Sequence, residues 1–211
     1  MGLQYQHLIE NSLATFAKQF MDPKVDGIEL DVQLTKDNKV VVFHDKTTER
    51  IFRNIKPPKT ITEILFSDLP ADIPLLVDVL KHPFRRKDVL VDIELKLYDD
   101  DQSDILLKHV RKVCVECGPC AKPYVFSSFC SRLFSKPEVI PLDILAGGIV
   151  DKNMFLEADD VSTVRGIYTL CESYSLTDID KKVLEKINEI KSQEPFYVIT
   201  NDVDATVEFF S

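Results

Sequence analysis

The sequence has no long apolar run and no excess of basic residues, and both absences exclude whole classes of protein. No stretch approaches the ~20 apolar residues that are needed to cross a bilayer. The first residues, MGLQYQHLIEN, lack the basic and then apolar pattern of a signal peptide. The net charge is −9, whereas nucleic acids and anionic membranes bind basic faces. We therefore expect no membrane span and no nucleic-acid partner, although a phosphate substrate stays compatible if a cation supplies positive charge.

The chain also lacks internal repeats, low-complexity tracts and recognisable linkers. Its 211 residues fit the size of one domain, and a hydrophobic content of 45% is ordinary for a globular protein. The sequence therefore predicts a single domain over residues 1–211.

Cysteine is present in an odd number, five, which favours a reducing compartment and predicts a cytoplasmic protein. Three of the cysteines, Cys114, Cys117 and Cys120, form a C-x2-C-x2-C run that could hold zinc or an iron–sulfur cluster. No fourth ligand is evident and Pro119 lies inside the run, so we favour reduced, structural thiols.

Acidic residues gather in the stretch 26–45, DGIELDVQLTKDNKVVVFHD, which reads as two strands joined by a tight turn. Alternate residues of a strand share a face, so Glu29 and Asp31 point the same way. Two close carboxylates repel unless a cation or a proton lies between them, and His44 at the end of the second strand titrates near neutral pH. This pattern indicates a metal and acid/base site. An amphipathic strand with a hydrated acidic face and a surface histidine is the alternative.

A second alternating strand is predicted over residues 89–97, VLVDIELKL, where Asp92, Glu94 and Lys96 share one face. With the first strand, it would supply a third carboxylate to a site of hard oxygen ligands, which suits Mg²⁺ or Ca²⁺. The alternative is a surface ion pair between Glu94 and Lys96, worth at most about 1 kcal/mol.

Strands alternate with helical patterns along the rest of the chain, which favours a parallel sheet covered by helices. Two strands carry one wholly polar face, which suits the mouth of a closed barrel better than the centre of an open sheet. We therefore predict an α/β, TIM-barrel-like (β/α)8 fold, incomplete or irregular at its first and last strands, with a doubly wound open sheet as the alternative. Further strands are expected at residues 124–128, 142–149, 166–170 and 196–200. Helices are expected near 13–20, 73–80, 105–117, 129–134 and 176–191, with a short last helix that ends at residue 210.

The strings DGIELDVQLTKDN and VVFHD resemble the signature of the glycerophosphodiester phosphodiesterase family. The segments IPLLVDVL and YVFSSF are similar to further motifs of that family. The resemblance implies a TIM-barrel enzyme that uses a divalent metal to hydrolyse glycerophosphodiesters, such as glycerophosphocholine, to glycerol 3-phosphate and an alcohol. It also implies that Glu29, Asp31 and Glu94 hold Mg²⁺ or Ca²⁺, that Lys96 lies beside the phosphate, and that His44 is the acid/base catalyst.

One family motif, His-Arg-Gly before a Pro-Glu-Asn-Thr motif, is not found here. The segment 10–13, ENSL, resembles the second motif, and His7 precedes it without a following arginine. His7 is a candidate to replace the missing histidine. Two hypotheses follow: an active, metal-dependent glycerophosphodiester phosphodiesterase, or a degenerate member that binds a metal or a phosphodiester without turnover. Because a lost acid/base group removes about 10²–10⁴-fold in rate, we expect weak or no hydrolysis by the chain as given.

Overall fold

The computed structural model describes residues 8–53, 57–98, 103–118, 122, 124–129, 145–148, 167–170, 178–190, 197–200 and 203–210. Contacts divide the chain into two compact units, one formed by Leu8–Ala146 and one that contains Gly147–Ser211. Each unit is treated by itself below. The single domain over residues 1–211 stays a prediction. Among the described residues, no helix is both long enough and apolar enough to span a membrane.

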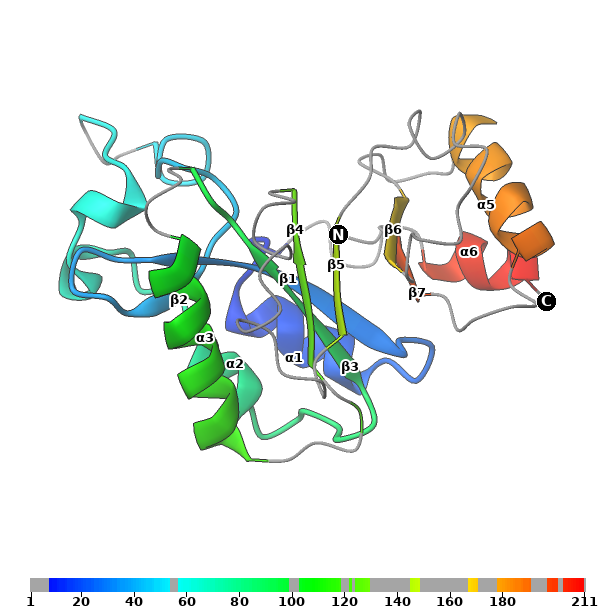
Figure 1. Ribbon diagram of the computed structural model, residues 1–211, viewed down its shortest axis with the longest axis horizontal. Coiled ribbons are helices and arrows are strands. Elements are labelled where there is room, and N and C mark those ends of the chain that lie inside the picture. The colour runs from blue at the N-terminus through cyan, green and yellow to red at the C-terminus, as the bar shows by residue number, and fades with distance from the viewer. Residues whose placement is uncertain are drawn as a thin grey trace. The chain divides into compact units, whose positions relative to one another are not determined.

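A five-stranded sheet, ordered β2-β1-β3-β4-β5, contains the strands that carry the predicted site (Figure 1). β1 pairs antiparallel with β2 and parallel with β3, which in turn pairs parallel with β4. The strand bounds are Gly27–Leu34 for β1, Val40–Val42 for β2, Leu90–Leu95 for β3, Tyr124–Ser128 for β4 and Leu145–Gly148 for β5.

The hairpin formed by β1 and β2 corrects one expectation about His44. A short turn can join only antiparallel strands. β2 therefore runs back beside β1, with Val42 opposite Val32, and ends two residues before His44. The backbone N–H of Phe43 donates to the carbonyl of Asp31 at 2.9 Å. His44 thus follows an antiparallel strand rather than ending a parallel barrel strand, and the backward course of β2 brings the chain level with Asp31.

In the described part of this unit, the sheet is accompanied by the helices α1 Leu13–Met21, α2 Leu76–Leu80 and α3 Ser103–Cys117. Short 3₁₀ turns at Ile61–Glu63 (η2) and Phe66–Asp68 (η3) occupy the proline-containing connection between β2 and α2. Helix α2 contacts α1, α3 and β2, and α3 also contacts β2. Of the cysteines of α3, Cys114 is buried and Cys117 is half-buried, whereas Cys120 lies outside the described residues.

Helix α1 begins at a side-chain cap. The hydroxyl oxygen of Ser12 accepts a hydrogen bond from the backbone N–H of Thr15 at 3.3 Å, as expected for an N-cap residue. Asn11, the residue before this cap, adopts a left-handed conformation with φ of 56°. Its side chain is therefore left to make a different contact, described below.

The core of the first unit is formed by apolar residues of both strands and helices. They are Phe16 and Phe20 of α1, Leu30 and Val32 of β1, Leu76 and Val79 of α2, Ile93 and Leu95 of β3, Leu107 and Val110 of α3, and Phe126 of β4, all at most 2% exposed. Polar residues of β1 and β3 are also buried, namely Asp31, Gln33, Asp92 and Glu94. The hydrated acidic face considered as an alternative is therefore wrong.

The second unit contains a parallel pair of strands, β6 Ile167–Leu170 and β7 Tyr197–Thr200, with helices α5 Asp178–Ile190 and α6 Val203–Phe210. Within the described residues the strands form two sheets of five and two strands rather than one closed ring. The α/β class with parallel strands is confirmed, and closure into a (β/α)8 barrel stays a prediction. The helix expected at 129–134 lies outside the described residues except for Phe129, which is in a bend.

The burial of β4 generates a stability prediction with a matched control. Phe126 is fully buried and Phe129, three residues later, is 65% exposed. Because truncating a buried phenylalanine loses transfer free energy and leaves a cavity, Phe126→Ala should lower the free energy of unfolding by about 3–5 kcal/mol. Phe129→Ala should cost less than about 1 kcal/mol. Urea unfolding of the two variants measures both values, and equal losses would contradict the placement of β4 in the core.

Candidate functional site

The parallel register of β1 and β3 stacks four carboxylates. Glu29 lies opposite Asp92, and Asp31 lies opposite Glu94. Ligand oxygens of Glu29, Asp31 and Glu94 all lie within 4.8 Å of one another. Oxygens that bind one Ca²⁺ lie at most about 5 Å apart, twice the bond length. The structure thus brings together the three residues expected to bind metal, and their role as ligands stays a prediction.

Burial and mutual repulsion both oppose ionisation of this cluster. Burial, followed by the charges of Asp31, Asp92 and Glu94, raises the pKa of Glu29 well above its ordinary value. Burial and then the charge of Asp31 raise the pKa of Glu94. The Oε1 atom of Glu29 is buried without a hydrogen-bond partner among the described residues. A buried acceptor with no donor and a set of hard oxygen atoms fit a divalent cation. Such a cation would offset both the cost of burying the charged carboxylates and their mutual repulsion.

Lys96 supplies the positive charge in this cluster. Its ammonium lies 3.0 Å from Asp31 Oδ1 and 2.5 Å from Glu94 Oε1, and its side chain is only 10% exposed. Burial would lower the pKa of Lys96, but the charges of the two carboxylates outweigh it and raise the pKa above the ordinary value. The surface ion pair between Glu94 and Lys96 considered as an alternative is therefore wrong, because the contact is buried and includes Asp31.

Asn11 belongs to this site, although the sequence predicted no role for it there. Its side-chain amide donates to Asp31 Oδ2 at 2.8 Å. With Lys96 on Oδ1, this contact fixes the orientation of the Asp31 carboxylate. The signal was present in the ENSL segment, but only the fold shows that Asn11 faces a residue 20 positions away.

Asp92 is the fourth carboxylate, and no role was predicted for it from the sequence. Its side chain is 2% exposed and accepts a hydrogen bond from Ser127 Oγ at 2.8 Å. Burial raises the pKa of Asp92 to about 7, against the lowering effect of the Ser127 hydrogen bond and with the help of the charges of Glu94 and Asp31. A carboxyl group that is neutral near pH 7 limits the negative charge inside the sheet.

His44 lies beside this cluster on a segment whose backbone accepts three hydrogen bonds, two from the Gln33 side chain and one from the Tyr98 side chain. The side-chain amide of Gln33 donates to the carbonyls of Phe43 at 2.7 Å and of Asp45 at 2.8 Å. The hydroxyl of Tyr98 donates to the carbonyl of His44 at 2.5 Å. The imidazole itself is half-exposed, so the backbone is fixed while the ring faces solvent. His7, the candidate for a second histidine, lies outside the described residues.

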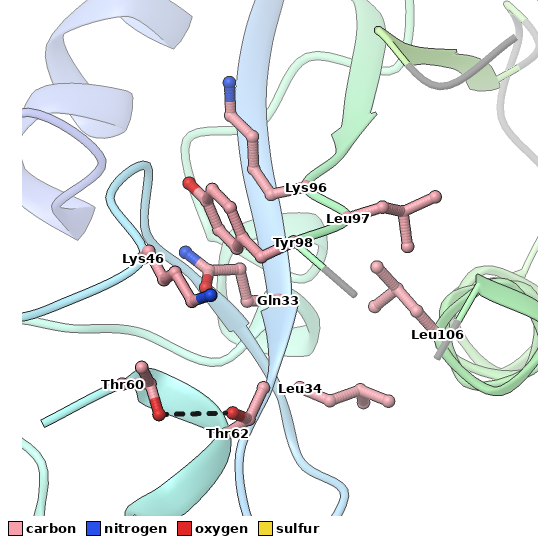
Figure 2. Close-up of a pocket in the computed structure, with 9 residues that line it drawn as sticks. All are labelled: Gln33, Leu34, Lys46, Thr60, Thr62, Lys96, Leu97, Tyr98 and Leu106. Atoms are coloured by element: carbon pink, nitrogen blue, oxygen red, sulfur yellow. Dashed lines mark hydrogen bonds between the residues drawn. The ribbon is translucent and has the colours of Figure 1, made fainter. Parts of the chain in front are cut away.

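Lys96 also lines a pocket, whose lining residues are drawn in Figure 2. It encloses about 360 Å³, which includes open solvent. In Figure 2 the ammonium of Lys96 extends away from Thr60 and Thr62, while the ring of Tyr98 lies beside Gln33. The lining residues are Gln33, Leu34, Lys46, Thr60, Thr62, Lys96, Leu97, Tyr98 and Leu106. Lys96 therefore belongs both to the carboxylate cluster and to the wall of a polar, cationic pocket.

Comparison with known proteins assigns the class of this site. The Glycerophosphoryl diester phosphodiesterase family matches residues 2–136, and the chain belongs to that family. It is 37% identical over 156 residues to the uncharacterized protein YqiK of Bacillus subtilis, covering 64% of this chain and 63% of that protein. It is 40% identical over 98 residues to a glycerophosphodiester phosphodiesterase of Caldanaerobacter subterraneus, covering 41% of this chain and 40% of that protein. The chain thus spans less than two thirds of the length of these relatives.

The fold is similar to that of a solved relative, an Oleispira antarctica phosphodiesterase in complex with the product sn-glycerol-3-phosphate. The TM-score is 0.66 and the identity 17%, with 95% of this chain and 83% of that chain covered. At this identity the likeness shows the fold, and the fold agrees with the family assignment.

The raised pKa of Asp92 predicts a pH dependence of stability. A carboxyl whose pKa rises from about 4 in the unfolded chain to about 7 in the folded chain binds its proton more tightly when folded. Its contribution is fully present below pH ~4 and is lost as the pH rises through ~7. In EDTA, stability should therefore fall between these values, by at most ~1.4 kcal/mol per pH unit from this group. Urea unfolding at several pH values measures the slope.

Asp92→Asn keeps the shape of the side chain and removes the proton equilibrium, so its slope over the same range should be flatter. Asp88→Asn, at an exposed position just before the same strand, should keep the wild-type slope. A slope unchanged in Asp92→Asn would show that Asp92 is ionised in the folded protein.

Proposed function

We propose that this protein is a metal-dependent phosphodiesterase that hydrolyses glycerophosphodiesters, such as glycerophosphocholine, to glycerol 3-phosphate and an alcohol. The observation that carries the proposal is the convergence of Glu29, Asp31 and Glu94 with Lys96 on one buried site. Membership of the glycerophosphoryl diester phosphodiesterase family supports it. So does the glycerol 3-phosphate product bound by the Oleispira antarctica enzyme of similar fold.

The three carboxylates would hold the cation, and Mg²⁺ or Ca²⁺ suits their oxygen atoms. A bound divalent cation would neutralise the phosphodiester and stabilise the charge that develops during phosphoryl transfer. Lys96 would add a second positive charge beside the phosphate, since its ammonium contacts Asp31 and Glu94, two of the proposed metal ligands. Lysine acts here as a compact point charge.

His44 would act in acid/base catalysis. As the imidazolium it would donate a proton to the oxygen of the departing alcohol, which is a poor leaving group as an alkoxide. Its carbonyl is held by Tyr98, and its segment is held by Gln33, so the ring would start from a fixed backbone position.

The cytoplasmic location remains a proposal from the five cysteines alone.

A second candidate function is a degenerate family member that binds a metal or a phosphodiester without turnover. Among the residues that the structure describes, His44 lies beside the carboxylates and no second histidine is placed there to act as an acid or base. Release of glycerol 3-phosphate from glycerophosphocholine with excess metal separates the two candidates.

Metal binding should stabilise the folded protein by mass action. At a metal concentration one hundred times Kd, the free energy of unfolding should rise by about 2.7 kcal/mol relative to EDTA. Thermal melts with millimolar Mg²⁺ or Ca²⁺ measure the change. A Glu29→Gln, Asp31→Asn variant should lose the rise and be at least as stable as wild type in EDTA, because carboxylate repulsion is relieved.

Glu49 and Asp72 offer a matched control, since both acidic residues are exposed and lie apart from the three carboxylates. A Glu49→Gln, Asp72→Asn variant changes the net charge equally and should keep the metal-dependent rise. An equal rise in all three proteins would contradict the proposed site.

His44→Ala should lower kcat by about 10²–10⁴-fold, the usual effect of losing a general acid/base group. The metal-dependent rise in stability should persist in this variant, because His44 is not among the three proposed ligands. Full activity after this substitution would show that another group protonates the leaving alcohol. Activity that also collapses in His7→Ala would favour the active enzyme over the degenerate member.

A further inference from the structure

The ring of His44 is held by its neighbour in the sequence. His44 Nδ1 lies 2.7 Å from Asp45 Oδ1. The histidine side chain is half-exposed, whereas that of Asp45 is 20% exposed. A half-exposed ring has little packing to fix its rotation about the side-chain bonds, so its orientation depends on this hydrogen bond.

Asp45 is in turn held by Arg50, five residues later. The guanidinium donates from Nε to Asp45 Oδ2 at 2.5 Å and from Nη2 to Asp45 Oδ1 at 2.9 Å. The other side of the guanidinium donates from Nη1 to Glu10 Oε2 at 3.0 Å and from Nη2 to Glu10 Oε1. Both carboxylates are thus bound through two parallel contacts, a geometry that arginine forms and lysine does not.

These contacts join two distant parts of the chain around one histidine. Glu10 lies just before α1 and is 40 residues from Arg50. The neighbouring Asn11 contacts Asp31 in the carboxylate cluster. The segment 10–11 therefore contacts both the Asp45–Arg50 pair and a proposed metal ligand.

The charges determine which nitrogen of His44 carries a proton. Partial burial opposes ionisation of Asp45, but the hydrogen bonds and charges of Arg50 and His44 outweigh it and lower the pKa of Asp45. An ionised carboxylate can only accept hydrogen bonds. The contact at 2.7 Å therefore requires a proton on Nδ1, and Nε2 is left as the nitrogen that can exchange a proton with a ligand.

Glu10, His44 and Asp45 also satisfy the spacing of a second metal site, with ligand atoms within 4.8 Å of one another. The guanidinium of Arg50 already provides a cation bound to both carboxylates of this group. Its charge compensates them without an ion, so the arrangement favours a structural role for the carboxylates over a second metal site.

We propose that Asp45 and Arg50 are positioning residues for His44: Asp45 fixes the Nδ1–H tautomer and the ring orientation, and Arg50 anchors Asp45 to Glu10. The proposal rests on the proposed function, in which His44 protonates the leaving alcohol. In that step the Nε2–H bond breaks, its electron pair stays on Nε2, and the proton goes to the alkoxide oxygen. The Nδ1–H bond to Asp45 is kept, which stabilises the imidazolium before transfer and leaves one defined neutral tautomer afterwards.

The surroundings of His44 contain further charges that the test must leave unchanged. Besides Asp45 and Arg50, Glu94 interacts electrostatically with the His44 side chain, and Lys96 is bound to Glu94. Tyr98 contacts only the backbone carbonyl of His44. The variants are therefore confined to the Asp45–Arg50 pair, with Arg53 as the matched control. Arg53 is exposed and has no ion pair with any residue that the structure describes.

The first measurement needs no substrate. Long-range ¹H–¹⁵N spectra of the full labelled chain at about pH 8.5, where an ordinary histidine is neutral, report which ring nitrogen is protonated. The His44 signals are identified by their loss in His44→Ala. Wild type should show Nδ1–H. Asp45→Asn should shift the equilibrium towards Nε2–H, because its amide can donate to Nδ1, and Arg50→Lys should give a mixture. Arg53→Lys should match wild type. Nε2–H in wild type, or an unchanged spectrum in Asp45→Asn, would overturn the proposal.

The second measurement is the hydrolysis of glycerophosphocholine with excess metal. Asp45→Asn and Arg50→Lys should lower kcat by about 10–100-fold, as is usual for residues that orient a functional group, and change KM little. In a His44→Ala background the same substitutions should cost nothing further, because residues that act through one group are not additive. An equal loss in both backgrounds would assign them a structural role and refute the proposal.

The two measurements also separate this proposal from the proposed function. If wild type does not hydrolyse glycerophosphodiesters, the proposed function fails while the spectra still decide how His44 is held. If wild type is active and the spectra follow the variants but kcat does not, the positioning role is refuted and the proposed function stands.

Discussion

The parallel register between β1 and β3 is the constraint on which the candidate site depends. It places Asp31 beside Glu94 and Glu29 beside Asp92, and three of these residues, Asp31, Asp92 and Glu94, are buried. Four carboxylates in such a place repel strongly. The surrounding residues reduce that repulsion through the ammonium of Lys96, the amide of Asn11 and the hydroxyl of Ser127. A bound divalent cation would add to this compensation, since burial and the neighbouring carboxylates still raise the pKa values of Glu29 and Glu94.

The neighbouring group of Glu10, Asp45 and Arg50 differs from this cluster in its balance of charge. Around Arg50, two carboxylates and one guanidinium are matched in geometry and nearly in charge, so no further cation is needed. Around Glu29, Asp31 and Glu94, three carboxylates face one ammonium. This difference in charge balance separates a group suited to hold a side chain in place from a group suited to bind a metal. The two groups are linked through residues 10 and 11, which contact one each.

Much of the site could be predicted because strand alternation is a local property. Glu29 and Asp31 share a face by their spacing, as do Glu94 and Lys96, and the long match to a family signature indicated what they would do. The tight turn predicted between the first two strands is also a local property, and the structure shows the antiparallel hairpin that such a turn requires. A turn of a few residues forces an antiparallel return, and that return, rather than the end of a barrel strand, places His44 next to Asp31.

By itself, the sequence determined the residue types, the faces that they share and the family to which the chain belongs, because these depend on spacing along the chain. Only the tertiary structure decided that the acidic faces are buried, that Asn11 orients Asp31, and that Arg50 joins Asp45 to Glu10. Those contacts join residues up to 40 positions apart in the sequence. Burial and long-range pairing arise when the strands and the segment before α1 pack together, and no periodicity within one segment encodes which distant partner a carboxylate will meet.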